Sequence, residues 1–227
     1  MKAEPIASGV KVWDLPTRIF HWTLVALIAL QFASGEYDLL PMEWHFRLGY
    51  ATLALILFRV LWGFFGSESA RFGQFLRGPV AVLRYLGDSI AQREAAHPGH
   101  NPLGGWSVVA MLLCVAVQAA SGLFASDDIS EFGPLCARVS DATVQWMTRI
   151  HKIDRLVLLV LIALHVSAVL LHRVFRRDHL VAAMLHGRKR IADLHAPLRF
   201  APPGRALALA ALSAAIVWAI VAWGAAA

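Results

Sequence analysis

The chain has 227 residues, of which 58% are hydrophobic, and its mean hydropathy of +0.59 is too high for a soluble domain of this length. Its net charge of +6 does not indicate a nucleic-acid binder, because the basic residues lie beside apolar segments and do not alternate with aromatic residues. With two cysteines and no CxxCH or paired CxxC motif, the chain has no disulfide framework, no thiolate zinc site and no thioether-bound haem.

Five apolar segments are long enough to span a bilayer, which takes about 20 residues. In chain order we expect them near residues 17–36, 45–65, 105–125, 150–173 and 206–226. The first is expected to be a retained helix, because no small-residue cleavage site follows it. Pro16 suits the first turn of that helix.

The basic residues predict the orientation of these segments. Three lie in the N-terminal tail, four in the second connection and eight in the fourth, against five on the opposite side. Because Lys and Arg are retained in the cytoplasm, we expect a cytoplasmic N-terminus and a periplasmic C-terminus. Arg59 is left inside the second segment.

Two histidines in the fourth segment suggest a bound redox group. His151 and His165 are fourteen residues apart in the run HKIDRLVLLVLIALH, which on a helix means about 21 Å and within about 40° of one face. An imidazole inside a membrane segment is costly and therefore a functional candidate. The pattern predicts a helix that holds two haems, one above the other.

Other histidines pair with these two by depth. His45 opens the second segment and His151 the fourth, so both are expected at the outer interface. His21 lies about 22 Å inward of the outer end of its helix, which matches the depth of His165. His172 competes for the inner position, but it would lie about 31 Å from His151. We therefore pair His45 with His151 and His21 with His165, and place His172 near the edge of the inner haem.

Histidine suits this chemistry, because two axial imidazoles leave iron no open site and favour electron transfer over oxygen binding. Without thioether bonds, the haems are expected to be two haem b groups. Their propionates need cationic partners. The candidates are Arg47, Lys152 and Arg155 at the outer level and Arg18, Arg59 and Arg173 at the inner level. For most of them a topology signal explains the charge equally well, whereas Arg59 lies too deep for that.

A short internal echo joins the first and third segments. The sequences LQFASG, at residues 30–35, and VQAASG, at residues 117–122, lie at equivalent depth near the outer ends of these helices. Gly35 and Gly122, with Gly49 one turn after His45, can let a porphyrin approach the backbone. Close packing of small residues between membrane helices explains the same pattern equally well.

The loop HPGHNPLGGW places His97 and His100 just before the third segment. They can serve a quinone head group or proton transfer, or they belong to an ordinary polar turn. No GxGxxG sequence follows a strand, so we do not expect the chain to oxidise NADH by itself.

Several runs resemble the bacterial cytochrome b561 family, in particular its branch of cytochrome b subunits of nickel-iron hydrogenases. They include FHW at residues 20–22, the stretch from His151 to His172, and the runs VWDLPTRIFHW, FRVLWGFFGSESARF and GHNPLGGWSVVAMLL. The resemblance covers about residues 11–190. It implies four helices with two bis-histidine b haems, carried over to His21, His45, His151 and His165. The fifth helix departs from the short family members.

The expected fold is an all-α membrane protein, with a four-helix transmembrane bundle for two haems in residues 1–190. Residues 191–227 form a basic linker and a fifth transmembrane helix. That helix has no ionisable side chain from 206 to 226, so we expect it to serve assembly or anchoring, held apart from the bundle by the linker.

The expected function is electron transfer across the bacterial inner membrane, between the quinone pool and a periplasmic or membrane redox partner. The expected redox partner is a soluble cytochrome or a hydrogenase-like subunit. We also expect contact with membrane lipid and association into homo-oligomers, and we expect no binding of nucleic acid. Two alternatives stay open: a self-contained quinone oxidoreductase acting on a small oxidant such as superoxide, and a non-redox helical transporter or anchor.

Overall fold

The computed structural model describes residues 9–37, 39–91, 99–176, 178–189 and 198–226. Outside these ranges lie His97, residues 191–197 of the linker, and the basic residues Lys2, Arg93, Arg177 and Arg190. Five helices are long and apolar enough to cross a membrane: α1 (Leu15–Gly35), α2 (Met42–Phe65), α5 (Pro102–Gly122), α6 (Asp141–Phe175) and α8 (Pro203–Ala225). The helical membrane fold predicted from the sequence is therefore confirmed.

Short elements precede or connect these helices. They are β1 (Val10–Lys11), η1 (Glu68–Ala70), α3 (Phe72–Phe75), α4 (Pro79–Ile90), η2 (Cys136–Arg138), α7 (Leu180–His186) and β2 (Arg188–Lys189). The two strands pair antiparallel, with Val10 opposite Lys189. This pairing joins residues 10–11 to the segment that follows α7.

Side-chain caps fix where three of the long helices begin. Asp14, Asn101 and Ser140 each accept a hydrogen bond from the backbone amide three residues later, which satisfies one of the free N–H groups of a first helical turn. Pro16 lies in the first turn of α1, as expected. These caps place the helix ends independently of hydropathy.

The start of α6 corrects one expectation. The helix begins at Asp141, nine residues before the predicted span, because Ser140 caps a polar stretch that a search for apolar segments passes over. Its 35 residues extend over about 52 Å, well beyond the roughly 30 Å of a hydrocarbon core. His151 therefore lies ten residues inside the helix and does not open it.

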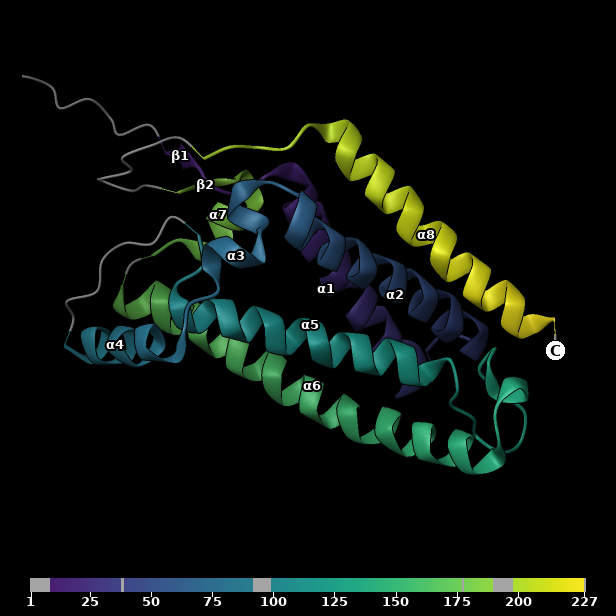
Figure 1. The fold of residues 1–227 in the computed structure, drawn as a ribbon. Coiled ribbons are helices and arrows are strands. Elements are labelled where there is room, and N and C mark those ends of the chain that lie inside the picture. Colours follow the sequence, from purple (N-terminus) through teal and green to yellow (C-terminus); the bar gives the residue numbers. More distant parts are fainter. Residues whose placement is uncertain (1–8, 38, 92–98, 177, 190–197, 227) are drawn as a thin grey trace, which may run out of the picture.

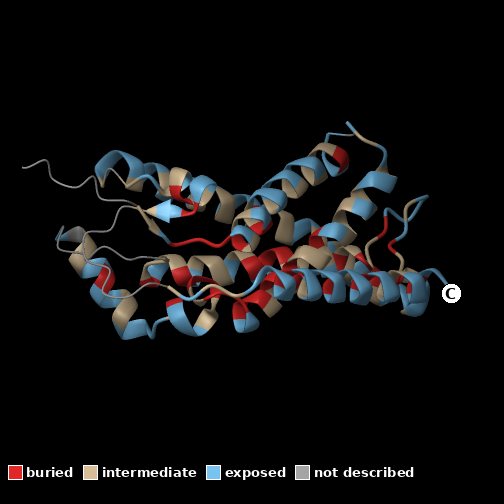
Figure 2. Cartoon of the chain, turned by 90° about the horizontal axis from the view of Figure 1, so that it is seen from above, coloured by how far each residue is buried: buried red, intermediate tan, exposed pale blue. Residues whose placement is uncertain are grey.

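The helices form two packed pairs (Figure 1). Helix α1 packs against α2 and α5 against α6, while α2 and α5 join the pairs. Buried residues gather where these helices meet, as the red segments of Figure 2 show, around Trp62, Ile56 and Val115. In contrast, α1 and α6 approach each other through side chains, including His21 and His165.

The outward faces of the bundle are apolar. Val160 and Leu164 on α6 and Trp218 on α8 are more than half exposed, and pale blue segments cover the outer faces of the helices in Figure 2. Such a surface would be unfavourable in water and matches lipid acyl chains. The exposed apolar faces agree with a multi-pass membrane protein.

Helix α8 is not held apart from the bundle, contrary to expectation. It runs along α2 (Figure 1), and Ala206 belongs to the same core as Trp62. Arg205 at its start donates to the Phe65 carbonyl oxygen at 3.0 Å, and near its end the Trp223 carbonyl accepts from Arg138 at 2.5 Å. Hydrogen bonds at both ends therefore fix the helix against its neighbours.

Candidate functional site

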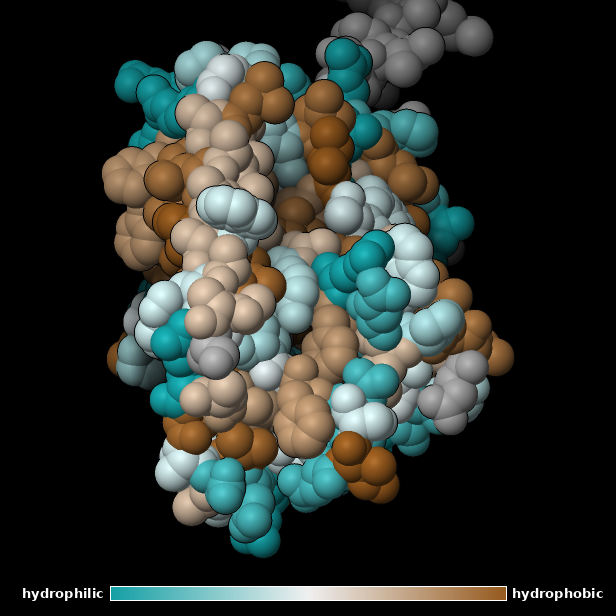
Figure 3. Space-filling view, turned by 90° about the vertical axis from the view of Figure 1, so that its right-hand side faces the viewer, coloured by the Kyte–Doolittle hydropathy of each residue, from teal (hydrophilic) through white to brown (hydrophobic). Residues whose placement is uncertain are grey.

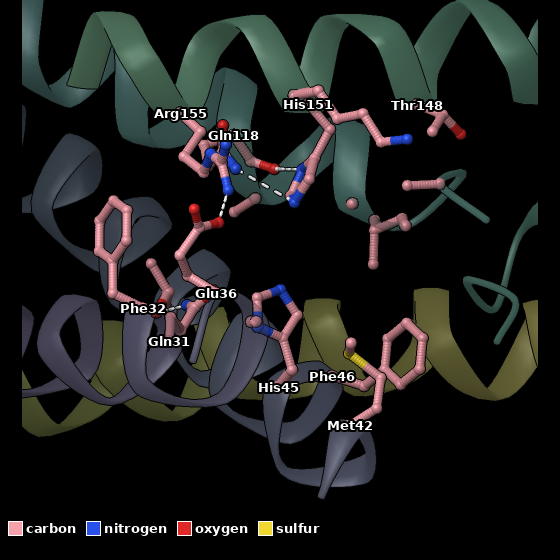
Figure 4. A pocket seen from close by; sticks show the side chains of 18 of the residues that line it. Gln31, Phe32, Glu36, Met42, His45, Phe46, Gln118, Thr148, His151 and Arg155 are labelled. Carbon is pink, nitrogen blue, oxygen red and sulfur yellow. Dashed lines mark hydrogen bonds and ion pairs between the residues drawn. The ribbon is translucent and has the colours of Figure 1, made fainter. Parts of the chain in front are cut away.

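Two histidines face each other across a pocket between α1, α2, α5 and α6 (Figure 4). We call the end of the bundle next to the 123–140 loop the outer end, and the pocket lies toward it. His45 projects from α2 and His151 from α6, with ring centroids 6.2 Å apart and ring planes at 78°. The pocket wall is mainly apolar, with Ile28, Phe32 and Leu158 among its residues.

The His151 ring is held by α5. Its Nδ1 atom lies 2.9 Å from the Gln118 carbonyl oxygen and 3.2 Å from Ser121 Oγ. A carbonyl oxygen only accepts hydrogen bonds, so Nδ1 carries the proton and donates it. The lone pair is therefore on Nε2, where the Gln118 side-chain amide donates to it at 3.1 Å.

The His45 ring is held by α1 in a similar way. Its Nδ1 atom lies 3.1 Å from Ser34 Oγ. The Ser34 hydroxyl hydrogen is donated to the Gln31 carbonyl oxygen at 3.1 Å, which leaves the oxygen to accept from Nδ1. Both outer imidazoles thus donate at Nδ1 and carry the lone pair on Nε2, the tautomer in which imidazole binds a metal. At His151 the Gln118 amide occupies that lone pair and would have to move for a metal to bind there.

A second pair of histidines lies farther inward. The rings of His21, on α1, and His165, on α6, have centroids 6.5 Å apart and planes at 51°. His21 also contacts the Trp22 ring edge-on, and its Nδ1 atom is buried without a hydrogen-bond partner among the described residues. No ring contact in the described part of the chain joins His21 to His172. The structure thus brings His21 to His165, as the depth argument expected.

Both pairs fit the axial positions of a haem. Two metal–imidazole bonds of about 2 Å each place the ring centroids on either side of a metal roughly 6 Å apart, and the observed separations are 6.2 and 6.5 Å. Within the described ranges no group of three or more His, Cys, Asp or Glu side chains converges on one point. Each pair therefore suits a metal that arrives with equatorial ligands of its own, as haem iron does.

Charged side chains lie around the outer pocket. Lys152 and Arg155 line it, and Arg155 forms an ion pair with Glu36 across the gap between α6 and α1 (Figure 4). Arg47 instead pairs with Glu43 at 2.5 Å on the exposed surface. Figure 3 looks onto this end of the molecule and shows hydrophilic side chains, in teal, among hydrophobic ones.

Arg59 is the deepest charge at the inner end. It is 2% exposed, its guanidinium lies over the rings of Phe20 and Phe72, and its Nη1 atom has no hydrogen-bond partner among the described residues. Asp14 attracts this charge, but a buried cation without a hydrogen-bonded anion is costly. The position therefore suits an anionic group supplied by a ligand.

The other inner candidates are engaged differently. Arg18 donates to the carbonyl oxygens of Met184 and Leu185, at the end of α7. Arg173 contacts the ring of His179, on the exposed surface. These contacts give both arginines a structural role in the fold.

His100 lies against the rings of Trp13 and Phe75, with centroids 4.8 and 4.9 Å away. Burial, and next the charge of Arg59, lower the pKa of His100 to about 3. The ring is therefore neutral at physiological pH, and its Nδ1 atom is buried without a hydrogen-bond partner among the described residues. This packing places His100 inside the inner end of the bundle.

Sequence reasoning missed the residues that orient the outer histidines. Gln31, Ser34, Gln118 and Ser121 contact the two rings or the groups bound to them, yet only the glycines of the echo were singled out. The echo itself was the signal, because the same residue types recur at the same spacing on α1 and α5.

Comparison with known proteins places the chain in a family. The model of the prokaryotic cytochrome b561 family matches residues 12–187, which contain α1 to α7. No curated protein and no solved structure matches the chain. The family carries electrons across membranes through b-type haem, in agreement with the paired imidazoles. The chain belongs to the prokaryotic cytochrome b561 family.

Proposed function

We propose that the chain holds two b haems, an outer one between His45 and His151 and an inner one between His21 and His165. The observation that carries this proposal is the pair of centroid separations of 6.2 and 6.5 Å, each suited to two imidazoles on one iron. The fourteen residues between the two histidines of α6 correspond to about 21 Å of helix. Two redox groups would thus be stacked along the membrane normal.

When bound, haem b supplies an iron that changes between the ferric and ferrous states one electron at a time. His45 with His151, and His21 with His165, would hold the iron between paired imidazoles and would leave it no coordination site for oxygen. Apolar residues of the pocket wall, among them Ile28 and Leu158, would surround the ring of an outer haem. Arg59 would pair with a propionate of the inner haem, which would neutralise both buried charges. At the outer position Lys152 and Arg155 are placed to do the same.

The proposed route runs between the quinone pool and a periplasmic or membrane redox partner, with a cytochrome or a hydrogenase-like subunit as the expected partner class. The charge asymmetry of the connections supports a cytoplasmic N-terminus and a periplasmic C-terminus. Under this orientation the outer haem is the one nearer the periplasm.

We assign residues 1–190 to the haem bundle and residues 191–227 to an anchoring segment. Two observations support this division. The family match ends at residue 187, and within the described ranges no residue of α8 lines the outer pocket. The contact of α8 with α2 supports a role in holding the bundle or its partners in place.

The test is the haem content of the protein purified from membranes. A pyridine haemochrome assay should give two b haems per chain, and electron paramagnetic resonance (EPR) should show two low-spin ferric signals. Replacement of His45 or His151 by Ala should remove one signal, whereas His186→Ala, on the exposed face of α7, should keep both. A ratio of one or zero in fully loaded wild-type protein would contradict the proposal.

A further inference from the structure

The sequence repeat shared by α1 and α5, called the echo above, lies beside an outer histidine in each of its two copies. Each copy reads Gln-x-x-Ser-Gly: residues 31–35 face His45, and residues 118–122 face His151. We propose that these two copies are positioning elements for the outer haem. Each copy fixes the tautomer and ring orientation of one outer ligand, and no described residue does the same for Nδ1 of His21 in the inner pair. This inference rests on the proposed function.

The copy on α5 shows the complete arrangement. Ser121 Oγ donates to the Gln118 carbonyl oxygen at 3.1 Å, and both oxygens lie within 3.2 Å of His151 Nδ1. The ring therefore has two acceptors at Nδ1 and none at Nε2. Such outer hydrogen bonds fix the ring and make a ligating imidazole a stronger electron donor.

The copy on α1 repeats the serine contact, whereas the Gln31 side-chain amide donates to Thr52 Oγ1 at 2.8 Å and not to the imidazole. Ser34 is 1% exposed, its hydroxyl donates to the Gln31 carbonyl oxygen at 3.1 Å, and its oxygen lies 3.1 Å from His45 Nδ1. Ser34 on α1 and Ser121 on α5 thus make equivalent contacts to histidines that belong to two other helices, α2 and α6. Helix packing by small residues does not require a serine hydroxyl to meet an imidazole nitrogen in both copies.

The glycine of each copy leaves room for the ring. A Cβ atom built on Gly35 would lie 2.7 Å from Cε1 of His45, and one on Gly122 would lie 3.1 Å from Cε1 of His151. The first distance is too short for any real contact, and the second is tight. Because both rings lie directly against the helix backbone, any larger residue must push them toward the pocket.

The inner pair differs from the outer pair in the hydrogen bonding of the imidazole Nδ1 atom. His21 Nδ1 is buried without a hydrogen-bond partner among the described residues. His21 would therefore be a weaker electron donor to a bound iron than His45 or His151. Stronger donation stabilises the ferric state, so the echo should lower the potential of the outer haem and leave the inner haem unaffected.

The experiment compares the two haems within one protein. Ser34→Ala, Ser121→Ala and the double variant are titrated potentiometrically while the two low-spin EPR signals are followed. We expect two haems per chain, a higher midpoint potential and a changed g-value for the outer haem, the largest effect in the double variant, and an unchanged inner haem. Loss of the outer haem alone would also support the inference, because its ligands would have lost their anchors.

Glycine variants give a second readout. Gly35→Ala should reduce outer haem content or alter its EPR signal, and Gly122→Ala should do so less, in the order of their contact distances. Gly87→Ala on α4 is the matched control, because an added Cβ there meets nothing within 4 Å.

Three outcomes would overturn the inference: unchanged outer potential and EPR signal in the double serine variant, equal shifts at both haems, or loss of both haems. The last two are what general helix packing predicts. Failure of the proposed function is seen separately, as a wild-type haem ratio below two.

Discussion

Replacement of His165 by Ala should leave the purified protein with one haem per chain. The His21 ring faces His165 at 6.5 Å, close to the separation that two axial ligands require, and the truncation leaves one side of that position empty. His172 cannot substitute, because seven residues place it about 10.5 Å farther along α6. The surviving EPR signal should be that of the outer haem.

His172→Ala is the matched control for this loss. It removes an imidazole from the same helix and should retain two haems. His21→Ala should reproduce the loss, and the double His21→Ala/His165→Ala variant should lose no more than either single variant, because both residues serve one position. Two haems in His165→Ala together with one in His172→Ala would refute the depth argument and assign the inner position to His172.

Three further predictions follow from the described contacts. Gly49→Ala should leave the stability of the haem-free protein unchanged or slightly raised, since nothing lies within 4 Å of the added Cβ and Ala favours helix. The outer haem content should fall if a porphyrin occupies the adjoining pocket, and an unchanged haem spectrum would place the porphyrin elsewhere. Trp62→Ala should lower the free energy of unfolding by about 3 kcal/mol, because the ring is 0% exposed and its Nε1 donates to Asp14 at 3.1 Å. Trp62→Phe should lower it less, and equal losses in the two variants would contradict the packing argument. Hydrogen bonds from the backbone amide of Glu131, and then from those of Ile129 and Ser130, lower the pKa of Asp127 from 3.8 to about 2. These bonds stabilise the loop above pH 4, and their contribution is lost as the pH falls toward 2. Hydrogen exchange of the loop, corrected for the intrinsic rate, should therefore rise over that range in wild type and stay constant in Asp127→Asn.

Much of the helical layout is readable from the sequence, because apolar length alone decides which segments can cross a bilayer. The start of α6 was missed, since its polar first turns lie outside any apolar window and only the Ser140 cap marks it. The contact of α8 with α2 was missed as well. It depends on hydrogen bonds such as that of Arg205 to the Phe65 carbonyl, which link residues far apart in the chain.

Spacing along a helix follows from helix geometry, so the sequence by itself determined that five segments can cross a membrane and how far apart the histidines of one helix lie. The histidine pairing was predicted from that spacing. Rotation of one helix about its axis relative to another is set by packing. Only the tertiary structure could therefore show that the His45 ring lies against Gly35 and Ser34, and that His151 meets the same residue types on α5. The echo was visible as a string of letters, but its relation to the ligands depended on which face each helix turns toward the pocket.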